Sequence, residues 1–335
     1  MYKTSARAAL APASARARAR ALSHLMLSLI LSVSFSATCP HLTPLARAEE
    51  RESEGGDPHG GGEWRHAHLI AARANPPGLV SDSAMGYSLP LRHLYGAEEA
   101  HPLLGPTRAL LGLNALLTPQ NVQLGPLLRA TPLTVLELQL SARYILPLNG
   151  VARARRSQVS DAATLAAITP ARGGADSILT QGWRLNAQAR LQMKVGRVAA
   201  RSAHMLRADS LSPHGSTGTF YDQTLDVTTP FDGLTYQAES EALYVSPDER
   251  LIAGLRHTYA APLGAGSEPL SRLGPLVVWG IGEAGTNKSD KSDKSARKGL
   301  VLLSQWHLRH HSRAGQLVSA WVPYIAVGCV IEGVL

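Results

Sequence analysis

Apolar and polar residues alternate with a period of two along much of this 335-residue chain. In the clearest stretch, from Trp183 to Val195, every odd position is apolar and every even position is polar, from Arg184 to Lys194. On a helix these polar groups would be spread round the whole circumference, whereas on a strand they share one face. The same alternation recurs at residues 136–144 and 234–244. The chain is therefore predicted to be all-β.

Twelve runs of this kind are predicted as strands, and polar or Pro- and Gly-containing segments separate them. They are residues 81–91, 107–118, 121–130, 134–146, 182–196, 198–208, 218–229, 233–245, 249–260, 272–282, 299–309 and 318–333. The long connections, such as 147–181 and the KSDKSDKS repeat at 288–295, are predicted to be solvated loops. An even number of antiparallel strands is typical of bacterial barrels, although the long connections predicted here do not all fall at one end.

The strands are predicted to form a transmembrane β-barrel. They exceed the roughly five or six residues common in globular sheets and match the roughly nine to eleven tilted residues that cross a bilayer. Their polar faces carry Arg, Lys and Glu in mid-strand, which a wet lumen accommodates and a dry core does not. An aromatic content of only 5% is low for such a barrel. A secreted soluble β-sandwich with a binding role stays open, because an apolar face can also meet another sheet.

The N-terminal segment has the layout of a secretory signal peptide. Basic residues from Lys3 to Arg20 precede an apolar run that starts at Leu25, and no acidic residue occurs before Glu49. We therefore predict that residues 1–48 are removed on export. An alternative is cleavage and lipidation at Cys39, but the preceding residues 35–38 match a lipoprotein site poorly.

Removal of residues 1–48 changes the electrostatic interpretation, because six of the 33 basic residues lie there and none of the 25 acidic ones does. The remaining chain is close to neutral, so a nucleic-acid partner is not expected. It also retains a single cysteine, Cys329, which excludes a disulfide-stabilised scaffold.

Residues 49–78 are rich in Gly, His, Glu and Pro, and are predicted to be a flexible periplasmic leader before a barrel at residues 79–335. Metal binding by His59, His66 and His68 is an alternative, but a histidine-bearing tail is the commoner case. No metal or other cofactor is expected.

Residues 122–144, 249–259 and the final segment 300–335 resemble a poorly characterised family of Gram-negative bacterial outer-membrane β-barrel proteins. The resemblance rests on strand patterns over residues 80–335. It implies a location in the outer membrane, contact with outer-membrane lipid and insertion by the barrel-assembly machinery, and it implies no oligomeric state. One departure is the ending Val334-Leu335, where such barrels usually carry an aromatic residue.

The predicted lumen-lining residues are charged groups on the polar strand faces. They are Arg129, Glu137, Arg143, Arg184, Arg190, Lys194, Asp222, Asp226, Glu239, Glu241 and Arg256. Their order along the chain suggests a basic wall facing an acidic wall, or alternatively pairs that close a narrow barrel. Aromatic residues near strand ends are predicted to form girdles at the membrane interfaces. They are Tyr144, Trp183, Tyr236, Tyr244 and Tyr259.

No enzymatic activity is predicted, and the leading functional hypothesis is a channel, a small-solute transporter or a structural membrane protein of unknown substrate. His214 and Ser216 place a base beside a nucleophile, as an outer-membrane lipid hydrolase would require. They lie in a Gly-rich turn, however, where neighbouring residues rarely reach the geometry for proton transfer. The spacing of His307, His310 and His311 would suit a metal only on a helix, and here predicts a basic cluster near lipid headgroups.

Overall fold

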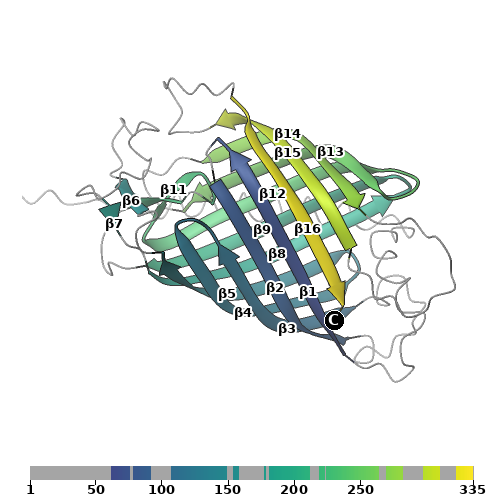
Figure 1. Ribbon diagram of the computed structural model, residues 1–335, viewed down its shortest axis with the longest axis horizontal. Helices are drawn as coiled ribbons and strands as arrows, with labels where there is room; N and C mark the ends of the chain where they lie inside the picture. The colour runs from purple at the N-terminus through teal and green to yellow at the C-terminus, as the bar shows by residue number, and fades with distance from the viewer. Residues whose placement is uncertain are drawn as a thin grey trace, which may run out of the picture.

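The computed structural model describes residues 62–75, 78–91, 107–148, 154–157, 177–178, 181–211, 219–222, 224–263, 269–281, 297–309 and 322–334. Within these ranges twelve long antiparallel strands close into a barrel (Figure 1). They are β1 (Glu63–Ala74), β2 (Gly78–Pro90), β3 (Arg108–Leu117), β4 (Asn121–Leu133), β5 (Leu136–Pro147), β8 (Gly182–Val195), β9 (Val198–Leu211), β12 (Asp232–Val245), β13 (Leu251–Pro262), β14 (Leu270–Ile281), β15 (Arg297–Arg309) and β16 (Tyr324–Val334).

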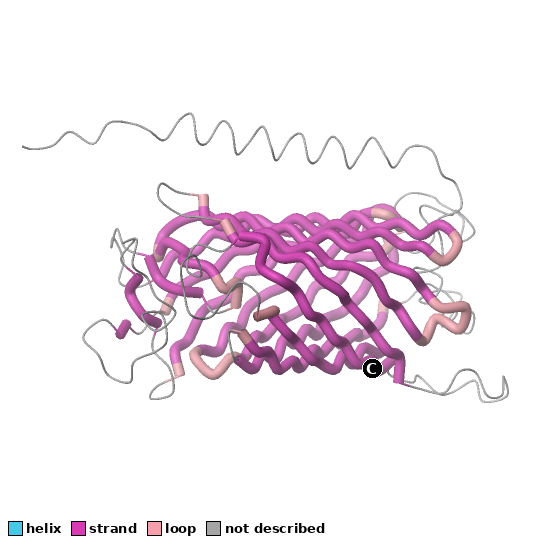
Figure 2. The backbone as a smooth tube through the Cα atoms, turned by 90° about the horizontal axis from the view of Figure 1, so that it is seen from above, coloured by secondary structure: helices cyan, strands magenta, loops and turns pink. Residues whose placement is uncertain are grey.

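Each barrel strand pairs with its neighbours in the order β1-β16-β15-β14-β13-β12-β9-β8-β5-β4-β3-β2. The ring is completed by β1 and β16, which pair antiparallel from Arg65 opposite Val334 to Ala74 opposite Ile325. Figure 2 shows the strands running obliquely along the barrel, as closure of a twisted sheet requires. The closed ring confirms the predicted antiparallel barrel and excludes the two-layer sandwich.

A second, four-stranded sheet has the order β11-β10-β6-β7 and consists of short strands. They are β6 (Ala154–Ser157), β7 (Ser177–Ile178), β10 (Thr219–Asp222) and β11 (Val227–Pro230). It lies at the end of the barrel where β5 ends and β8 begins (Figure 1), which we call the hairpin end. The opposite end, where β1 begins and β16 ends, is called the termini end.

Two predicted segments differ from the structure, although the number of barrel strands is the same. Residues 63–74, predicted as part of a flexible leader, form barrel strand β1. The alternation there is hard to recognise because His66 and His68 occupy outer-face positions. Residues 218–229 are predicted as one barrel strand, but their described part belongs to two short strands, β10 and β11, because the chain reverses at Asp226, whose φ is 61°.

The outer face of the barrel is apolar. Exposed leucines such as Leu111 and Leu113 alternate with the less exposed Gly112 and Asn114 along β3. The same alternation holds on β8, where Trp183 and Leu185 are about half exposed. An apolar outer band on a closed sheet is the surface that a β-barrel presents to lipid.

Several inner-face glycines allow neighbouring backbones to approach closely. A Cβ atom at Gly254 on β13 would lie 2.0 Å from the carbonyl oxygen of Ala242 on β12. No side-chain movement relieves such an overlap, because the obstructing atom belongs to the backbone. At Gly299 on β15, in contrast, the nearest atom to an added Cβ is 3.5 Å away.

These two positions give a matched test of closure. We expect Gly254→Ala to lower the free energy of unfolding by about 1–3 kcal/mol, because the added methyl group forces β12 and β13 apart. Gly299→Ala should change it little. The urea midpoint of the folded, gel-shifted band measures both, and equal midpoints for the two variants would contradict the close approach at Gly254.

Candidate functional site: the charged interior

The hairpin β10–β11, residues 219–230, lies across the inside of the barrel at the hairpin end. It contacts inner-face residues that belong to six strands around the ring: Arg73 on β1, Ile145 on β5, Arg184 on β8, Arg207 and Leu211 on β9, Ala260 on β13 and Leu270 on β14. Since β1, β5 and β13 lie far apart in the ring order, the segment reaches across the lumen. We call residues 219–230 the inner hairpin.

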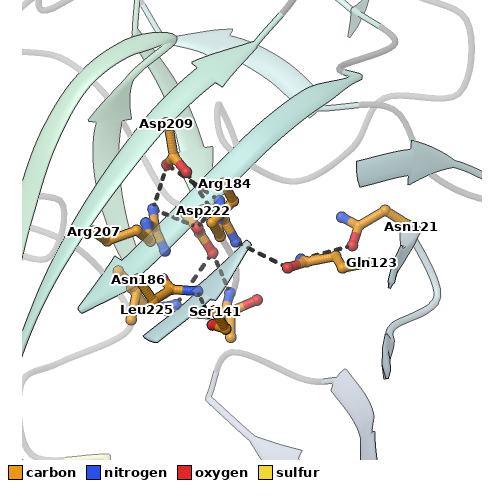
Figure 3. Close-up of polar contacts among 10 residues, drawn as sticks. Asn121, Gln123, Ser141, Arg184, Asn186, Arg207, Asp209, Asp222 and Leu225 are labelled. Carbon is orange, nitrogen blue, oxygen red and sulfur yellow. Dashed lines mark hydrogen bonds and ion pairs between the residues drawn. The ribbon is translucent and has the colours of Figure 1, made fainter. Parts of the chain in front are cut away.

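A buried cluster of four charged side chains joins the inner hairpin to the wall (Figure 3). Arg184 lies 2.7 Å from Asp209 and 3.0 Å from Asp222, and Arg207 lies 3.0 Å from Asp209 and 2.8 Å from Asp222. All four residues are buried. Two guanidinium groups thus neutralise two carboxylates, which is the arrangement that makes buried charges tolerable. Arg184 also donates to Gln123 on β4 at 3.5 Å.

Asp222 holds the turn of the inner hairpin as well as the wall. One carboxylate oxygen accepts hydrogen bonds from the backbone N–H groups of Thr224, at 2.7 Å, and Leu225, at 3.3 Å. Burial alone would raise the pKa of Asp222, but Arg207, Arg184 and these two N–H groups outweigh it and lower the pKa far below its ordinary value. The carboxylate therefore remains charged at any physiological pH.

A second group of inner-face charges lies on β4, β5, β8 and the turn between β12 and β13. Glu137 forms ion pairs with Arg190 at 2.9 Å and with Arg129 at 3.9 Å. Lys194 pairs with Glu249 at 3.0 Å. These contacts place acidic and basic side chains next to each other on one side of the lumen.

A third group lies on β9, β12 and β13. Glu241 accepts hydrogen bonds from Arg201 and from Arg256, each at 2.7 Å. Glu239 lies 3.9 Å from Arg256. A buried carboxylate between two guanidinium groups forms a rigid element of the wall, because each partner fixes the other.

The remaining predicted residues take different positions. Arg143 on β5 pairs with Asp82 on β2 at 3.2 Å, so this ion pair passes over the inner faces of β3 and β4, which separate the two strands. Asp226 is almost fully buried and lies in the turn of the inner hairpin. The sequence predicted Asp222 and Asp226 to lie on a barrel strand. In the structure they belong to the inner hairpin instead.

The prediction of a basic wall facing an acidic wall is wrong. Acidic groups lie beside basic groups around the ring, most of them on the same or adjacent strands, as the pairs Glu137–Arg190 and Glu241–Arg201 show. The alternative hypothesis, pairing inside a narrow barrel, describes the observed contacts.

Sequence reasoning missed several inner-face charges, most of which belong to these networks. They are Asp82, Arg201, Arg207, Asp209 and Arg272. On β9 the available signal was the period of two, which puts the residues at odd positions on one face. It was obscured because Ser202 and His204 place polar groups on the outer face, while alanines occupy the inner one.

The predicted aromatic residues lie toward both ends of the barrel. Tyr144 and Trp183 are paired across β5 and β8 at the hairpin end, with ring centroids 5.1 Å apart in an edge-to-face contact. Tyr259 lies 6.1 Å from Tyr236, which is four residues into β12. Tyr244 lies near the termini end of β12. Four further aromatic residues, which the sequence prediction missed, lie near strand ends: Trp64, Tyr87, Trp279 and Trp306.

Within the described ranges, no cluster of three or more His, Cys, Asp or Glu side chains is placed to hold a metal. His66 and His68 lie on the outer face of β1 with ring centroids 5.2 Å apart. His59, His214, Ser216, His310 and His311 lie outside the described residues. In the part of the chain that the structure describes, no helix has the length and hydrophobicity to span a bilayer.

No protein-family model matches the sequence, and no curated protein matches it either. Among solved structures, the chain is similar to CdiB from Acinetobacter baumannii, with 9% identity and a TM-score of 0.34 over 74% of this chain and 39% of CdiB. It therefore spans well under half the length of that protein. OpdK from Pseudomonas aeruginosa has 9% identity and a TM-score of 0.26 over 82% of this chain and 98% of OpdK. A Pseudomonas aeruginosa FadL homologue has 8% identity and a TM-score of 0.28 over 82% and 68% of the two chains. Likeness at this level says nothing about activity.

Because of the buried cluster, the stability of the inner hairpin is expected to depend on the charge of Asp222. Asp222→Asn leaves two buried guanidinium groups with one carboxylate, so we expect a loss of about 3–5 kcal/mol in the free energy of unfolding and faster hydrogen exchange at residues 224–227. Because the pKa of Asp222 is lowered, its stabilising contribution is complete above its ordinary pKa and is lost only as the pH falls through the lowered value. Wild-type exchange at residues 224–227 should therefore stay slow down to about pH 4.

The matched control is Asp248→Asn, which changes an exposed turn carboxylate that bonds to Ser246. It should leave exchange in the inner hairpin unchanged. Equal exchange rates in wild type and Asp222→Asn would show that the cluster does not anchor the hairpin.

Proposed function

We propose that this protein is a narrow solute channel of a bacterial outer membrane, in which the inner hairpin constricts one end. In this proposal the chain is exported by its signal peptide and inserted from the periplasm by the barrel-assembly machinery. The observation that carries the proposal is a polar, charged interior in a closed barrel whose exterior is apolar.

The aromatic residues support the membrane location. Tyr144 and Trp183 lie near one end of the barrel, and Trp64 and Tyr87 near the other, where their ring centroids are 5.6 Å apart. Aromatic residues at both ends of an apolar band mark the two lipid–water interfaces of such barrels. Exposed leucines such as Leu113 and Leu140 lie farther from the strand ends than these aromatic residues.

The position of the inner hairpin inside the barrel favours a constricted pore and argues against a wide one. A twelve-stranded barrel leaves only a small space after its inner side chains are placed. The hairpin takes part of that space at one end, where Phe220 and Phe231 pack with Ile145 and Leu211. Solutes small enough to pass would meet the charged side chains at close range, which favours selection by charge.

Planar-bilayer recording of the purified, refolded chain tests this function. We expect small, infrequent conductance steps for wild type and larger or longer openings for Asp222→Ala, because loss of the carboxylate releases the inner hairpin from Arg184 and Arg207. Asp248→Ala serves as the control and should behave as wild type. The absence of steps above baseline in every variant would eliminate the channel.

The charges on the inner face of the barrel predict whether the channel selects anions or cations. Basic side chains outnumber acidic ones on the inward positions of the barrel strands, and Arg272 keeps two buried guanidinium nitrogens, Nε and Nη1, that form no hydrogen bond. The guanidinium carbon of Arg272 lies 4.1 Å from the ring centroid of Tyr324, which fixes its orientation. A fixed, desolvated guanidinium group attracts small anions.

We therefore expect a reversal potential that shows preference for chloride over potassium across a salt gradient. Arg272→Gln should reduce that preference while leaving the folded, gel-shifted band intact. A cation-selective wild type, or an unchanged preference in Arg272→Gln, would contradict this part of the proposal.

A further inference from the structure

A hydrogen-bonded group of polar side chains lies on the outer face of β9 and β12, within a barrel exterior that is mostly apolar. Ser202 and His204 occupy even positions of β9 and alternate with Arg201 and Ala203 on its inner face. Tyr236 occupies the equivalent face of β12. Polar groups on a lipid-facing surface are costly, and such groups in a membrane protein commonly have a function.

The three side chains form a linear chain of contacts. The Oγ atom of Ser202 lies 2.9 Å from Nε2 of His204, and Nδ1 of the same ring lies 2.7 Å from the hydroxyl oxygen of Tyr236. When Nδ1–H donates to Tyr236, the lone pair on Nε2 faces the serine hydroxyl. A nucleophile, a base within hydrogen-bond distance and a third group that orients the base constitute a catalytic triad.

We propose that Ser202 and His204 form the catalytic centre of an ester hydrolase on the outer wall, with Tyr236 as the positioning residue. The substrate class is the acyl ester of a membrane lipid, because the site opens onto the surface that lipid covers. The proposal rests on the proposed membrane location but not on conduction through the lumen.

The reaction has two steps. In the first, Ser202 Oγ attacks the ester carbonyl carbon as His204 takes the hydroxyl proton, and cleavage of the acyl C–O bond passes that proton to the departing alcohol. In the second, water attacks the acyl-serine carbonyl and gives a proton to His204, which returns it to Ser202 Oγ as the carboxylic acid leaves. The net change is ester plus water to acid plus alcohol.

A neighbouring hydroxyl is placed to stabilise the tetrahedral intermediate. Ser240 Oγ on β12 lies 3.3 Å from Ser202 Oγ. A donor beside the nucleophile can reach an oxyanion that forms on the carbonyl attached to it. Both residues are at least partly accessible from the outer face.

Ser202 lies inside the apolar band of the barrel, nearer to its termini end. It lies four residues from Val198, the first residue of β9 at the termini end, which corresponds to about 13 Å along the strand. At a tilt of about 40°, that is about 10 Å along the barrel axis. Val198 pairs with Tyr244, which is placed near the lipid–water interface. Ser202 is therefore about 10 Å inside the level of Tyr244, so a lipid ester reaches it from the acyl-chain side.

A second serine–histidine pair on the same wall provides an internal control. Ser271 on β14 lies 2.9 Å from Nε2 of His257 on β13. No tyrosine or carboxylate within the described residues contacts the other nitrogen of this ring. The pair thus has the nucleophile and base but not the orienting group, and the proposal assigns it no activity.

The test uses the refolded full chain in mixed detergent–phosphatidylethanolamine micelles. A fluorophosphonate probe should label Ser202 covalently, and release of fatty acid from the phosphatidylethanolamine should accompany it. Ser202→Ala should abolish both, and His204→Gln should lower kcat by about 10²- to 10⁴-fold. Tyr236→Phe should lower kcat and leave KM unchanged, because its role is to orient the base.

Ser271→Ala is the matched control and should keep full labelling and activity. A water-soluble butyrate ester should be a much poorer substrate than the lipid if the site takes esters from the membrane. Every variant is first checked for the gel-shifted, folded band, so a loss of activity is distinguished from a loss of the barrel. Labelling at another serine, or no hydrolysis by folded wild type, would overturn the proposal, whereas conductance depends on other residues.

Discussion

A bilayer offers no water to backbone N–H and C=O groups, and that constraint governs this protein. An open sheet would leave two unpaired edges, so β1 and β16 must meet and pair along their lengths. Closure then divides every strand into a face toward lipid and a face toward the lumen. The close contact at Gly254 and the apolar exterior are consequences of that division.

The enclosed charges solve a second problem that closure creates. Buried inner-face arginines are costly without a counter-charge, and most of those described lie beside a carboxylate, as Arg190 does with Glu137. One carboxylate, Asp222, comes from a loop segment instead of the wall, and it couples the position of that segment to the electrostatics of the lumen. In the proposed channel, control of the pore and burial of charge depend on the same contacts. The outer-wall triad is separate from them, because β9 turns its even positions outward.

Much of the fold could be predicted from alternation, because a period of two requires no long-range information. Eleven of the predicted strands correspond to barrel strands with shifts at their ends. The failures have specific causes. The outward His66 and His68 concealed β1, and the turn at Asp226 converts an apparent strand into the inner hairpin. Many charged residues of the interior were found, but the sequence did not show which of them pair, since pairs such as Arg143 with Asp82 join residues far apart in sequence.

The sequence by itself determined the all-β class, the two-faced strands and the inward direction of most charges, because each depends on residues one or two positions apart. The tertiary structure alone decided where the ring closes, that residues 219–230 reach across the lumen and that acidic and basic groups are interleaved. It also decided that Ser202 and His204 meet Tyr236 across two strands. These features depend on which strands become neighbours, and strand order is set by the closure of the whole sheet.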